Sequence, residues 1–508
     1  MHVDRLIYGG EGVGRVDGLA IFVTGAAPSE VVRARVRKVH RRHVEADLIA
    51  VQSASADRVV PRCPHFEEGC GGCCWQHVTY PAQLAAKAAT VRDSLERLGG
   101  FRELPIRPII PAPEAYNYRN KMEFAFHPNG ILGLHPRGAW YDILRLRECL
   151  LGSPTAVAIV KVAQEFVESQ GISLYHPRAR QGLLRELCVR ESRSTGEILV
   201  GIVTSPGDFP EAQAMAAHLA KVDPRIAGVV RSIRSEPEGA ATLHLGKNPE
   251  RVLSNSRDEY HRAKPDGTHA PLQGKNPERV LSNSRDEYHR AKPDGTHALD
   301  TTVLHGQDHI TEIVGSLRFR IHMETFFQTN SVQAERLVDV VKDFAGDVDG
   351  VQVVDVYCGV GLFSLALAAA GARVVGVEIV EAAIKAARRN AAENGLASLS
   401  FHAGDARKVL AEVLPAGLAP KVLVLDPPRA GAGGKVMRRI ARACPERIVY
   451  VSCNPTTLAR DLVELRPFGY EVTAVQPIDL FPQTYHVETV VALECTREAS
   501  KGAMDPGK

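Results

Sequence analysis

Short apolar runs alternate with amphipathic stretches over the C-terminal part of the chain. The runs typical of buried strands are VQVVDV (351–356), ARVVGVE (372–378), LSF (399–401), KVLVLD (421–426) and RIVYVS (447–452). Stretches with a helical period, such as 381–395, lie between several of them. Strands and helices that alternate at this spacing predict a doubly wound, mostly parallel α/β sheet over residues 325–495.

The N-terminal pattern is different. Residues 1–55 hold short apolar runs separated by Gly-rich turns, which predicts a small OB-like β-barrel. Residues 56–324 mix strand and helix patterns, with a helix expected at 81–100, and predict an α+β central domain. Residues 496–508 are expected to form a frayed tail.

An identical repeat lies inside the central segment. The sequence GKNPERVLSNSRDEYHRAKPDGTHA occurs at 246–270 and again at 274–298. Two copies are too few for a solenoid, which needs about three units to bury a stacked core. The unit is also polar and poor in large apolar residues. We interpret 246–298 as a tandem duplication in a mobile surface loop, with an RNA-contacting insert as the alternative.

A basic strand is expected within the barrel. In VVRARVRKVHRRH (31–43), Val32, Ala34 and Val36 alternate with arginines, so the pattern predicts a core face and a cationic face. OB-like barrels use such faces to bind single-stranded nucleic acid. The alternative is a solvated basic edge that deters aggregation. The net charge of +3 is too small to decide between the two.

Composition limits the compartment. Nothing approaches the roughly 18 consecutive apolar residues of a membrane span, and the N-terminus lacks the layout of a signal peptide. A cytoplasmic protein is therefore expected, in which the ten cysteines stay reduced. They are then metal ligands, nucleophiles or core residues. The dense cysteine stretch at 63–77 fits either an iron–sulfur cluster or a four-cysteine zinc site by spacing alone.

Acids and a thiol follow the ends of the predicted parallel strands. They are Asp355, Glu378, Asp405, Asp426 and Cys453. Ligands bind at this edge of an open α/β sheet. The loop after the first strand lacks the full G-x-G-x-x-G motif of dinucleotide-binding sites. Glu378, at the end of the next strand, is expected to accept hydrogen bonds from the hydroxyls of a ribose. Asp405 is expected to accept a hydrogen bond from an adenine amino group. S-adenosylmethionine, which is cationic and carries no phosphate, suits this acidic edge better than a dinucleotide.

Cys453 is the predicted nucleophile. Carbon 5 of a pyrimidine accepts a methyl group once a thiolate has added to carbon 6, and a base must then remove the proton from carbon 5. Glu488 is the candidate base and His486 the second choice. The alternatives are a core cysteine at 453 and a structural ion-pair partner at 488. Cys358 is a weaker nucleophile candidate, and Cys188, Cys444 and Cys495 are expected to be packing residues.

Several stretches resemble the RNA uracil-5-methyltransferase family. They are FFQTN (326–330), DVYCGVGLF (355–363), LDPPRAG (425–431), YVSCNPTTLARD (450–461) and FPQTYHVE (481–488), and residues 1–55 resemble the TRAM module. The resemblance implies a class I, Rossmann-like methyltransferase domain with Cys453 as nucleophile and Glu488 as base. It also implies a set of residues that line the S-adenosylmethionine site, namely Gln328, Tyr357, Glu378, Asp405 and Asp426.

The resemblance also implies a metal site and a substrate. The ribosomal-RNA branch of the family carries a 4Fe-4S cluster, and the matching residues are Cys63, Cys70, Cys73 and Cys149, with Cys74 as a competing ligand and zinc as the alternative metal. The expected activity is methylation of one uridine, in large-subunit ribosomal RNA rather than transfer RNA, by a monomer. The alternative functions are a non-catalytic RNA-binding factor and a cytosine-5 methyltransferase.

Overall fold

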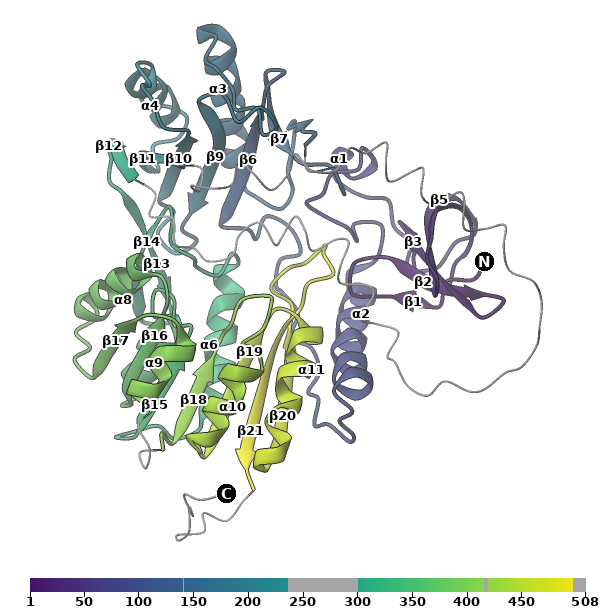
Figure 1. The fold of residues 1–508 in the computed structure, drawn as a ribbon. Helices are drawn as coiled ribbons and strands as arrows, with labels where there is room; N and C mark the ends of the chain where they lie inside the picture. Colours follow the sequence, from purple (N-terminus) through teal and green to yellow (C-terminus); the bar gives the residue numbers. More distant parts are fainter. Residues whose placement is uncertain (140, 236–299, 415–418, 497–508) are drawn as a thin grey trace, which may run out of the picture.

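The structure is a computed structural model that describes residues 1–139, 141–235, 300–414 and 419–496. The duplicated segment 246–298 and nearly all of the expected tail lie outside the described residues. The described residues form four sheets. Figure 1 shows the three larger sheets apart from one another, with α2 (Tyr80–Asp93) running between the N-terminal and the C-terminal sheets. None of the described helices is both long and apolar enough to cross a membrane.

The N-terminal sheet has five strands in the order β1-β2-β3-β5-β4. Its strands are β1 (Arg5–Leu6), β2 (Gly12–Val16), β3 (Leu19–Thr24), β4 (Val31–Val39) and β5 (His43–Ser53). All neighbours are antiparallel except β3 and β5. Its core is small and is built from Val3, Val23, Ala26, Val32 and Ala46.

The alternation predicted for the basic strand is only partly correct. Val32 is buried and Ala34 packs at the core, but Val36 is 56% exposed. β4 is an edge strand whose pairing with β5 is irregular at three places, and each irregularity changes which face a side chain meets. The arginines of β4 therefore face solvent beside an exposed valine.

The central sheet has seven strands in the order β12-β11-β10-β9-β6-β7-β8. Its strands are β6 (Lys121–His127), β7 (Ile131–Leu134), β8 (Leu144–Arg145), β9 (Leu184–Glu191), β10 (Ile198–Thr204), β11 (Ile226–Ile233) and β12 (Asp300–Gly306). Two helices, α3 (Pro154–Gln170) and α4 (Ala212–Ala220), share one apolar core with this sheet. The hairpin of β13 (His309–Val314) and β14 (Leu317–His322) joins its other face to the C-terminal core.

The C-terminal sheet confirms the predicted doubly wound topology. Its order is β17-β16-β15-β18-β19-β21-β20, and the strands from β17 to β19 are parallel. The strands are β15 (Gln352–Val356), β16 (Arg373–Glu378), β17 (Leu399–Ala403), β18 (Val422–Leu425), β19 (Arg447–Ser452), β20 (Tyr470–Ile478) and β21 (Glu488–Cys495). The last two form an antiparallel hairpin, and β21 inserts beside β19.

Helices cover both faces of this sheet. One face carries α6 (Ser331–Ala345), α7 (Leu362–Ala369) and α8 (Glu381–Glu393). The other carries α9 (Ala406–Val413), α10 (Gly434–Arg442) and α11 (Pro455–Val463). Each face is buried by its own apolar cluster, as expected for strands that are continuous apolar runs.

The helix expected at 81–100 forms as α2 with a π-helical continuation, Ser94–Leu98. It lies within the segment assigned to the central domain, yet Val91 and Leu95 belong to the core of the C-terminal sheet. The chain after it follows β20, with bridges from Ile106 to Val475 and from Ile110 to Ile478. Residues 80–112 therefore pack as part of the C-terminal body, because their apolar side chains find their partners there.

Candidate active site and cysteine cluster

The predicted strand-end residues meet at one edge of the C-terminal sheet. Glu378 ends β16, Asp426 follows β18 directly, and Cys453 follows β19 directly. Asp355 is the last residue but one of β15, and Asp405 lies two residues past β17. Because these five strands are parallel, all five side chains belong to the carboxyl edge, where open α/β sheets bind ligands.

A tight loop follows β15. Tyr357 has a φ of 66°, Gly359 of 55° and Gly361 of 93°, so the chain turns sharply before α7. The Glu378 carboxylate accepts hydrogen bonds from the backbone N–H groups of Gly359 (3.2 Å) and Val380 (2.9 Å). These bonds hold the acid at the mouth of the loop, which is where the sequence predicts the ribose of the cofactor.

Two acids at this edge have raised pKa values, Asp355, which is fully buried, and Asp426, which is half-buried. Asp355 is fully buried, accepts a hydrogen bond from the Ser364 hydroxyl at 2.6 Å, and has a pKa raised to about 7 by burial. Burial, followed by the charge of Asp355, also raises the pKa of Asp426 to about 7. An electropositive ligand would restore ionisation of both groups, which suits a sulfonium donor.

Two further predicted cofactor residues, Asp405 and Gln328, already have hydrogen-bond partners within the protein. Asp405 caps α9 by accepting from the Arg407 N–H at 2.8 Å, and its carboxylate also pairs with the Arg407 guanidinium, which lowers its pKa. Gln328 is buried, and its backbone carbonyl accepts a hydrogen bond from the Asn120 side-chain amide. An adenine amino group can therefore donate to the Asp405 carboxylate only if Arg407 shares this carboxylate or moves away from it.

Cys453 is held in a defined path. The Asn454 side chain caps α11 by accepting from the Thr456 N–H, and Pro455 opens that helix. Asn454 also donates to the Arg429 carbonyl at 3.2 Å, which ties the cysteine loop to the loop after β18. The thiol is half-buried, and its pKa is raised to about 12 by burial and then by Glu488, with Arg429 opposing.

Glu488 faces the cysteine because of the sheet topology. β21 runs antiparallel to β19, and Ser452 pairs with Thr489, so the start of β21 lies beside the end of β19. Glu488 is 2% exposed. Burial raises the pKa of Glu488 well above its ordinary value, Asp426 raises it further, and Arg429 opposes. Arg429, which the sequence analysis did not assign to the site, is thus the cation that faces both predicted catalytic groups.

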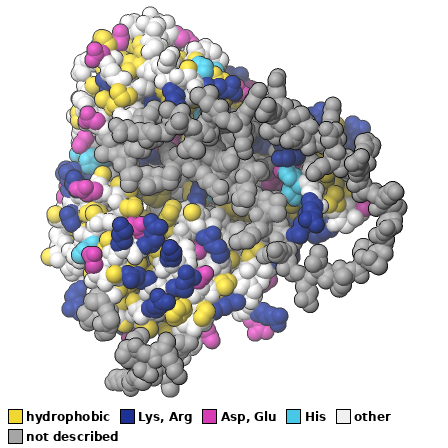
Figure 2. All heavy atoms as spheres, viewed as in Figure 1, with side chains coloured by type: hydrophobic (Ala, Val, Ile, Leu, Met, Phe, Trp, Pro, Cys, Tyr) yellow, Lys and Arg dark blue, Asp and Glu magenta, His cyan; other side chains and the backbone are white. Residues whose placement is uncertain are grey.

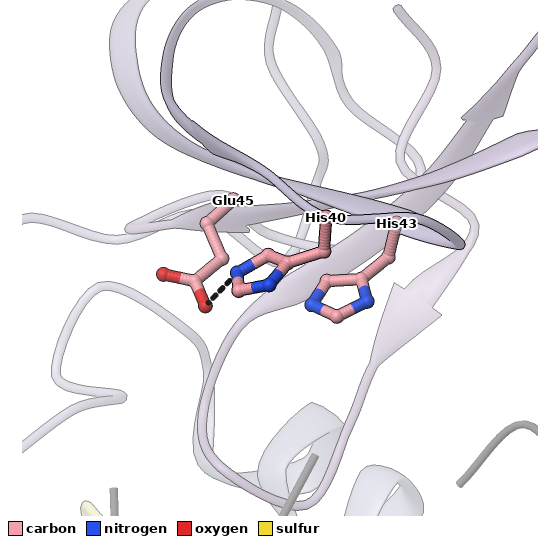
Figure 3. A group of neighbouring side chains, drawn as sticks. All are labelled: His40, His43 and Glu45. Carbon is pink, nitrogen blue, oxygen red and sulfur yellow. Dashed lines mark hydrogen bonds and ion pairs between the residues drawn. The ribbon is translucent and has the colours of Figure 1, made fainter. Parts of the chain in front are cut away.

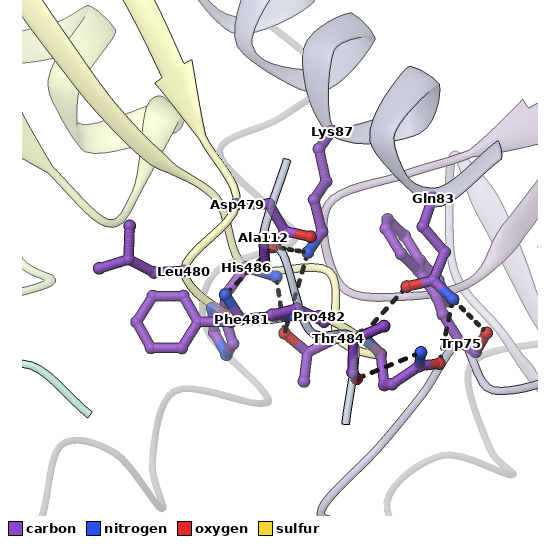
Figure 4. A network of polar contacts seen from close by, with 12 residues as sticks. Trp75, Gln83, Lys87, Ala112, Asp479, Leu480, Phe481, Pro482, Thr484 and His486 are labelled. Atoms are coloured by element: carbon purple, nitrogen blue, oxygen red, sulfur yellow. Dashed lines mark hydrogen bonds and ion pairs between the residues drawn. The ribbon is translucent and has the colours of Figure 1, made fainter. Parts of the chain in front are cut away.

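The loop between β20 and β21, residues 479–487, is fixed by α2 (Figure 4). The Lys87 ammonium donates to the Asp479 carboxylate at 2.6 Å and to the Phe481 carbonyl at 2.9 Å, and Lys87 and Asp479 are both fully buried. Gln83 and Gln483 exchange two hydrogen bonds of 3.0 Å. The helix therefore sets the path of the loop that leads into Glu488.

The four predicted metal ligands converge in the central body. Cys63, Cys70, Cys73 and Cys149 all line one cavity of about 20 Å³, whose other walls are mainly apolar. Two N–H groups already point at sulfur, from the Gln76 side chain to Cys73 (3.2 Å) and from the Gly72 backbone to Cys70 (3.5 Å). Four thiols with N–H···S donors and an apolar surround fit an iron–sulfur cluster, and four thiols fit zinc.

Cys74 does not join this group. It is absent from the lining of the cavity and packs instead beside Trp75 and Tyr485. Burial raises its pKa to about 12. Among the cysteines expected to be packing residues, Cys188 is buried and Cys495 packs against the core of the C-terminal sheet, whereas Cys444 is exposed and the packing role expected for it is wrong. Cys358, the weaker nucleophile candidate, is buried.

A larger cavity of about 350 Å³ lies next to the cysteine cavity and shares Gly72 and Leu134 with it. Arg119, Lys121 and Arg190 line it, together with Phe326, which is 66% exposed. The Nε atoms of Arg119 and Arg190 have no hydrogen-bond partner among the described residues. Buried guanidinium groups beside an exposed aromatic ring suit a phosphate and a base of single-stranded RNA.

Basic side chains are also grouped on the surface. Figure 2 shows Lys and Arg over the part of the C-terminal body where Figure 1 places α9 and α10. These helices carry Arg407, Lys408, Lys435, Arg438, Arg439 and Arg442. A positive surface of this kind attracts a polyanion before specific contacts form.

Three ligand-type side chains meet at the turn between β4 and β5 (Figure 3). The rings of His40 and His43 stack with centroids 4.2 Å apart, and His40 bonds Glu45 at 3.1 Å. Glu45 is already paired with Arg37, which lowers its pKa. Arg41 lies in the same turn, so the surroundings are cationic and disfavour a metal ion. We therefore interpret the contacts among His40, His43 and Glu45 as interactions that stabilise the basic turn.

Comparison with known proteins identifies the family. Residues 297–496 match the family described as tRNA (uracil-5-)-methyltransferase, and residues 2–49 match the TRAM domain. An uncharacterized RNA methyltransferase of Chlorobaculum tepidum is 35% identical, with 94% of this chain and 92% of the relative covered. One from Halalkalibacterium halodurans is 33% identical, with 97% and 96% covered.

A solved structure agrees over the whole chain. The tRNA (uracil-54, C5)-methyltransferase of Pyrococcus abyssi, in complex with S-adenosyl-L-homocysteine, is 27% identical with a TM-score of 0.67. The match covers 97% of this chain and 99% of that one. The chain therefore belongs to the RNA uracil-5-methyltransferase family and is an S-adenosylmethionine-dependent RNA methyltransferase.

Proposed function

We propose that this enzyme methylates carbon 5 of one uridine in RNA through a covalent bond between Cys453 and carbon 6 of the base. The observation that carries the proposal is the pairing of β19 with β21, which sets a thiol and a buried carboxyl group at adjacent strand ends. A thiol alone could be a packing residue, and a buried acid alone would lower the stability of the fold. Together they are the two groups that the reaction needs.

The Cys453 thiolate adds to carbon 6, and the electron pair of the C5–C6 double bond moves toward the carbonyl oxygen at carbon 4. Bound S-adenosylmethionine supplies the methyl group to carbon 5 and leaves as the thioether. Glu488 then takes the proton from carbon 5, the C5–C6 double bond re-forms, and the Cys453 sulfur leaves as thiolate. Glu488 must be a carboxylate at this step, and its raised pKa makes that carboxylate a stronger base toward a carbon-bound proton.

The donor site would be formed by Gln328, Tyr357, Glu378, Asp405 and Asp426. Glu378 is held by backbone N–H groups and would accept the ribose hydroxyls. The raised pKa of Asp426 supports a place beside the sulfonium, because a cation there lowers the cost of ionising the acid.

Cys63, Cys70, Cys73 and Cys149 would hold a 4Fe-4S cluster. When bound, the cluster ties the 63–73 segment to the segment before α3, and no methyl-transfer step requires it. Anaerobically purified protein should show broad iron–sulfur absorbance that is lost in Cys149→Ala and kept in Cys74→Ala. Zinc with no such absorbance would identify the alternative metal.

The substrate we propose is large-subunit ribosomal RNA, because the cysteine set matches that branch of the family. Transfer RNA is the second candidate, supported by the substrate named for the Pyrococcus abyssi enzyme. In either RNA the target base must leave its stack to reach a half-buried thiol, at a cost of a few kcal/mol.

The decisive experiment uses ribosomal and transfer RNA from cells that lack this protein. Wild-type enzyme with labelled S-adenosylmethionine should convert one uridine to 5-methyluridine, identified by mass spectrometry of the nucleosides. Glu488→Gln should accumulate an RNA–protein adduct that survives denaturing electrophoresis, and Cys453→Ala should form none. Cys444→Ala is the matched control, since this cysteine is exposed and precedes β19, at the end of the strand opposite to Cys453. Full turnover by Cys453→Ala would exclude the covalent route.

A further inference from the structure

Tyr8 is a residue of the N-terminal sheet region that contacts the candidate active site. It lies in the turn between β1 and β2, and its ring meets the ring of Tyr485 edge-on, with centroids 5.0 Å apart and planes at 78°. The His486 ring lies 6.3 Å away in a similar orientation. Tyr485 and His486 belong to the loop that leads into Glu488, so a residue of the RNA-binding module packs on the catalytic loop.

The turn that carries Tyr8 has little freedom. The Ile7 N–H donates to the Glu11 carbonyl, and the Gly10 N–H donates to the Ile7 carbonyl, both at 3.0 Å. The Trp75 indole N–H donates to the Gly10 carbonyl at 3.0 Å, and Trp75 is fully buried. Gly10 has a φ of 97°, and a Cβ there would lie 3.1 Å from the Cys74 sulfur. The position of Tyr8 is therefore set by the fold before RNA arrives.

The phenol oxygen of Tyr8 lies among the charged groups of the site. Burial raises the pKa of Tyr8, the nearby Tyr485, Cys453 and Glu488 raise it further, and Arg429 opposes. The group thus stays protonated and can donate a hydrogen bond. It donates to no other residue that the structure describes, although the ring is largely enclosed.

We propose that the Tyr8 hydroxyl donates a hydrogen bond to the carbonyl oxygen at carbon 4 of the target uracil. This inference rests on the proposed function. When Cys453 adds to carbon 6, negative charge develops on that oxygen, and a fixed donor stabilises the charge without reorganisation.

The test compares Tyr8→Phe with wild type in single-turnover reactions on the full-length enzyme and its RNA. Removing one preorganised donor costs about 10²–10³ in rate at other enzymes, and we expect a loss of at least about tenfold in the chemical step with little change in KM for RNA. Tyr470→Phe is the control, because it removes a buried hydroxyl that bonds the Pro445 carbonyl, away from the catalytic edge.

RNA with 4-thiouridine at the target position identifies the atom that Tyr8 contacts. Sulfur is a weak acceptor, so the thio substitution should slow wild type more than Tyr8→Phe, and the two effects should not be additive. Additive effects, or Tyr8→Phe at the wild-type rate, would overturn the inference. So would a slow Tyr8→Phe that also loses RNA or S-adenosylmethionine binding. A wild-type enzyme that makes no 5-methyluridine would instead reject the proposed function itself.

Discussion

At the scale of single residues, the proposed catalytic thiol, that of Cys453, has a raised pKa. Burial raises the pKa of Cys453, as do the neighbouring carboxyl groups Glu488 and Asp426, while Arg429 and a backbone hydrogen bond lower it. Most reactive cysteines lie in electropositive surroundings that lower their pKa. We therefore propose that the thiol of the free enzyme stays protonated and that the thiolate forms when the RNA substrate binds.

This arrangement predicts slow alkylation of Cys453 in the free enzyme. The rate with iodoacetamide should rise steadily from pH 6 to pH 9, because the pKa of about 12 leaves little thiolate in that range. Glu488→Gln removes a negative charge that faces the thiol, so it should lower the pKa of Cys453 and speed alkylation by up to about tenfold at the alkaline end.

Mass spectrometry of the peptide that contains Cys453 measures this rate. The exposed Cys444 serves as the internal control, and its rate should be the same in both proteins. An equal or lower rate for Cys453 in Glu488→Gln would show that the carboxyl group does not act on the thiol.

At the scale of elements, the site is assembled by one reversal of strand direction. β19 delivers Cys453 at its carboxyl end, and the antiparallel β21 delivers Glu488 at its start. The connecting loop would otherwise be free to move, and α2 fixes it through Lys87, Gln83 and their partners. The Lys87–Asp479 pair is fully buried, so each charge depends on the other.

Breaking this pair should destabilise the loop. Lys87→Met leaves Asp479 as an unpaired buried carboxylate and should cost about 3–5 kcal/mol of unfolding free energy. Lys87→Met/Asp479→Asn removes both charges and should recover most of that loss. Lys385→Met removes an exposed i,i+4 pair with Glu381 and should change stability by less than about 1 kcal/mol. Urea denaturation of the four proteins measures the differences, and equal losses for Lys87→Met and the double variant would contradict the argument.

The elements themselves could be predicted from the sequence, but their assembly only in part. The apolar runs placed β15, β16, β18 and β19 closely, because strands buried on both faces leave a continuous apolar signal. The destination of α2 could not be predicted, since its contacts with Asp479 span 392 residues and leave no periodic trace. Tyr8 and Arg429 were missed for the same reason, as their roles depend on neighbours from other parts of the chain.

At the scale of the whole molecule, the three bodies meet at the β20–β21 loop. Leu6 of the N-terminal sheet, Trp75 after the cysteine cluster and Tyr485 of the loop share one apolar cluster. The backbone N–H groups of Cys74 and Trp75 also donate to the Gln483 carbonyl. The RNA-binding module is therefore packed against the rest of the protein. A change in this packing should alter the loop that leads into Glu488.

Gly10 and Gly18 offer a matched test of this coupling. Both have positive φ angles, 97° and 79°, so an alanine at either position carries a similar backbone penalty of about 1 kcal/mol. They differ in their surroundings, because a Cβ at Gly18 meets nothing within 4 Å, whereas at Gly10 it crowds Cys74 and Tyr485. Gly10→Ala should therefore loosen the junction, and Gly18→Ala should not.

Hydrogen exchange at residues 479–488 reports the junction directly. In Gly10→Ala these amides should exchange faster than in wild type, and methyl transfer should be lost. Gly18→Ala should match wild type in both measurements despite its own backbone strain. These outcomes are expected because the β20–β21 loop is held from two sides, by the buried ion pair with α2 and by the close packing of the N-terminal turn. If both variants left exchange at 479–488 unchanged, α2 alone would hold the loop, and the N-terminal sheet would serve only to bind RNA.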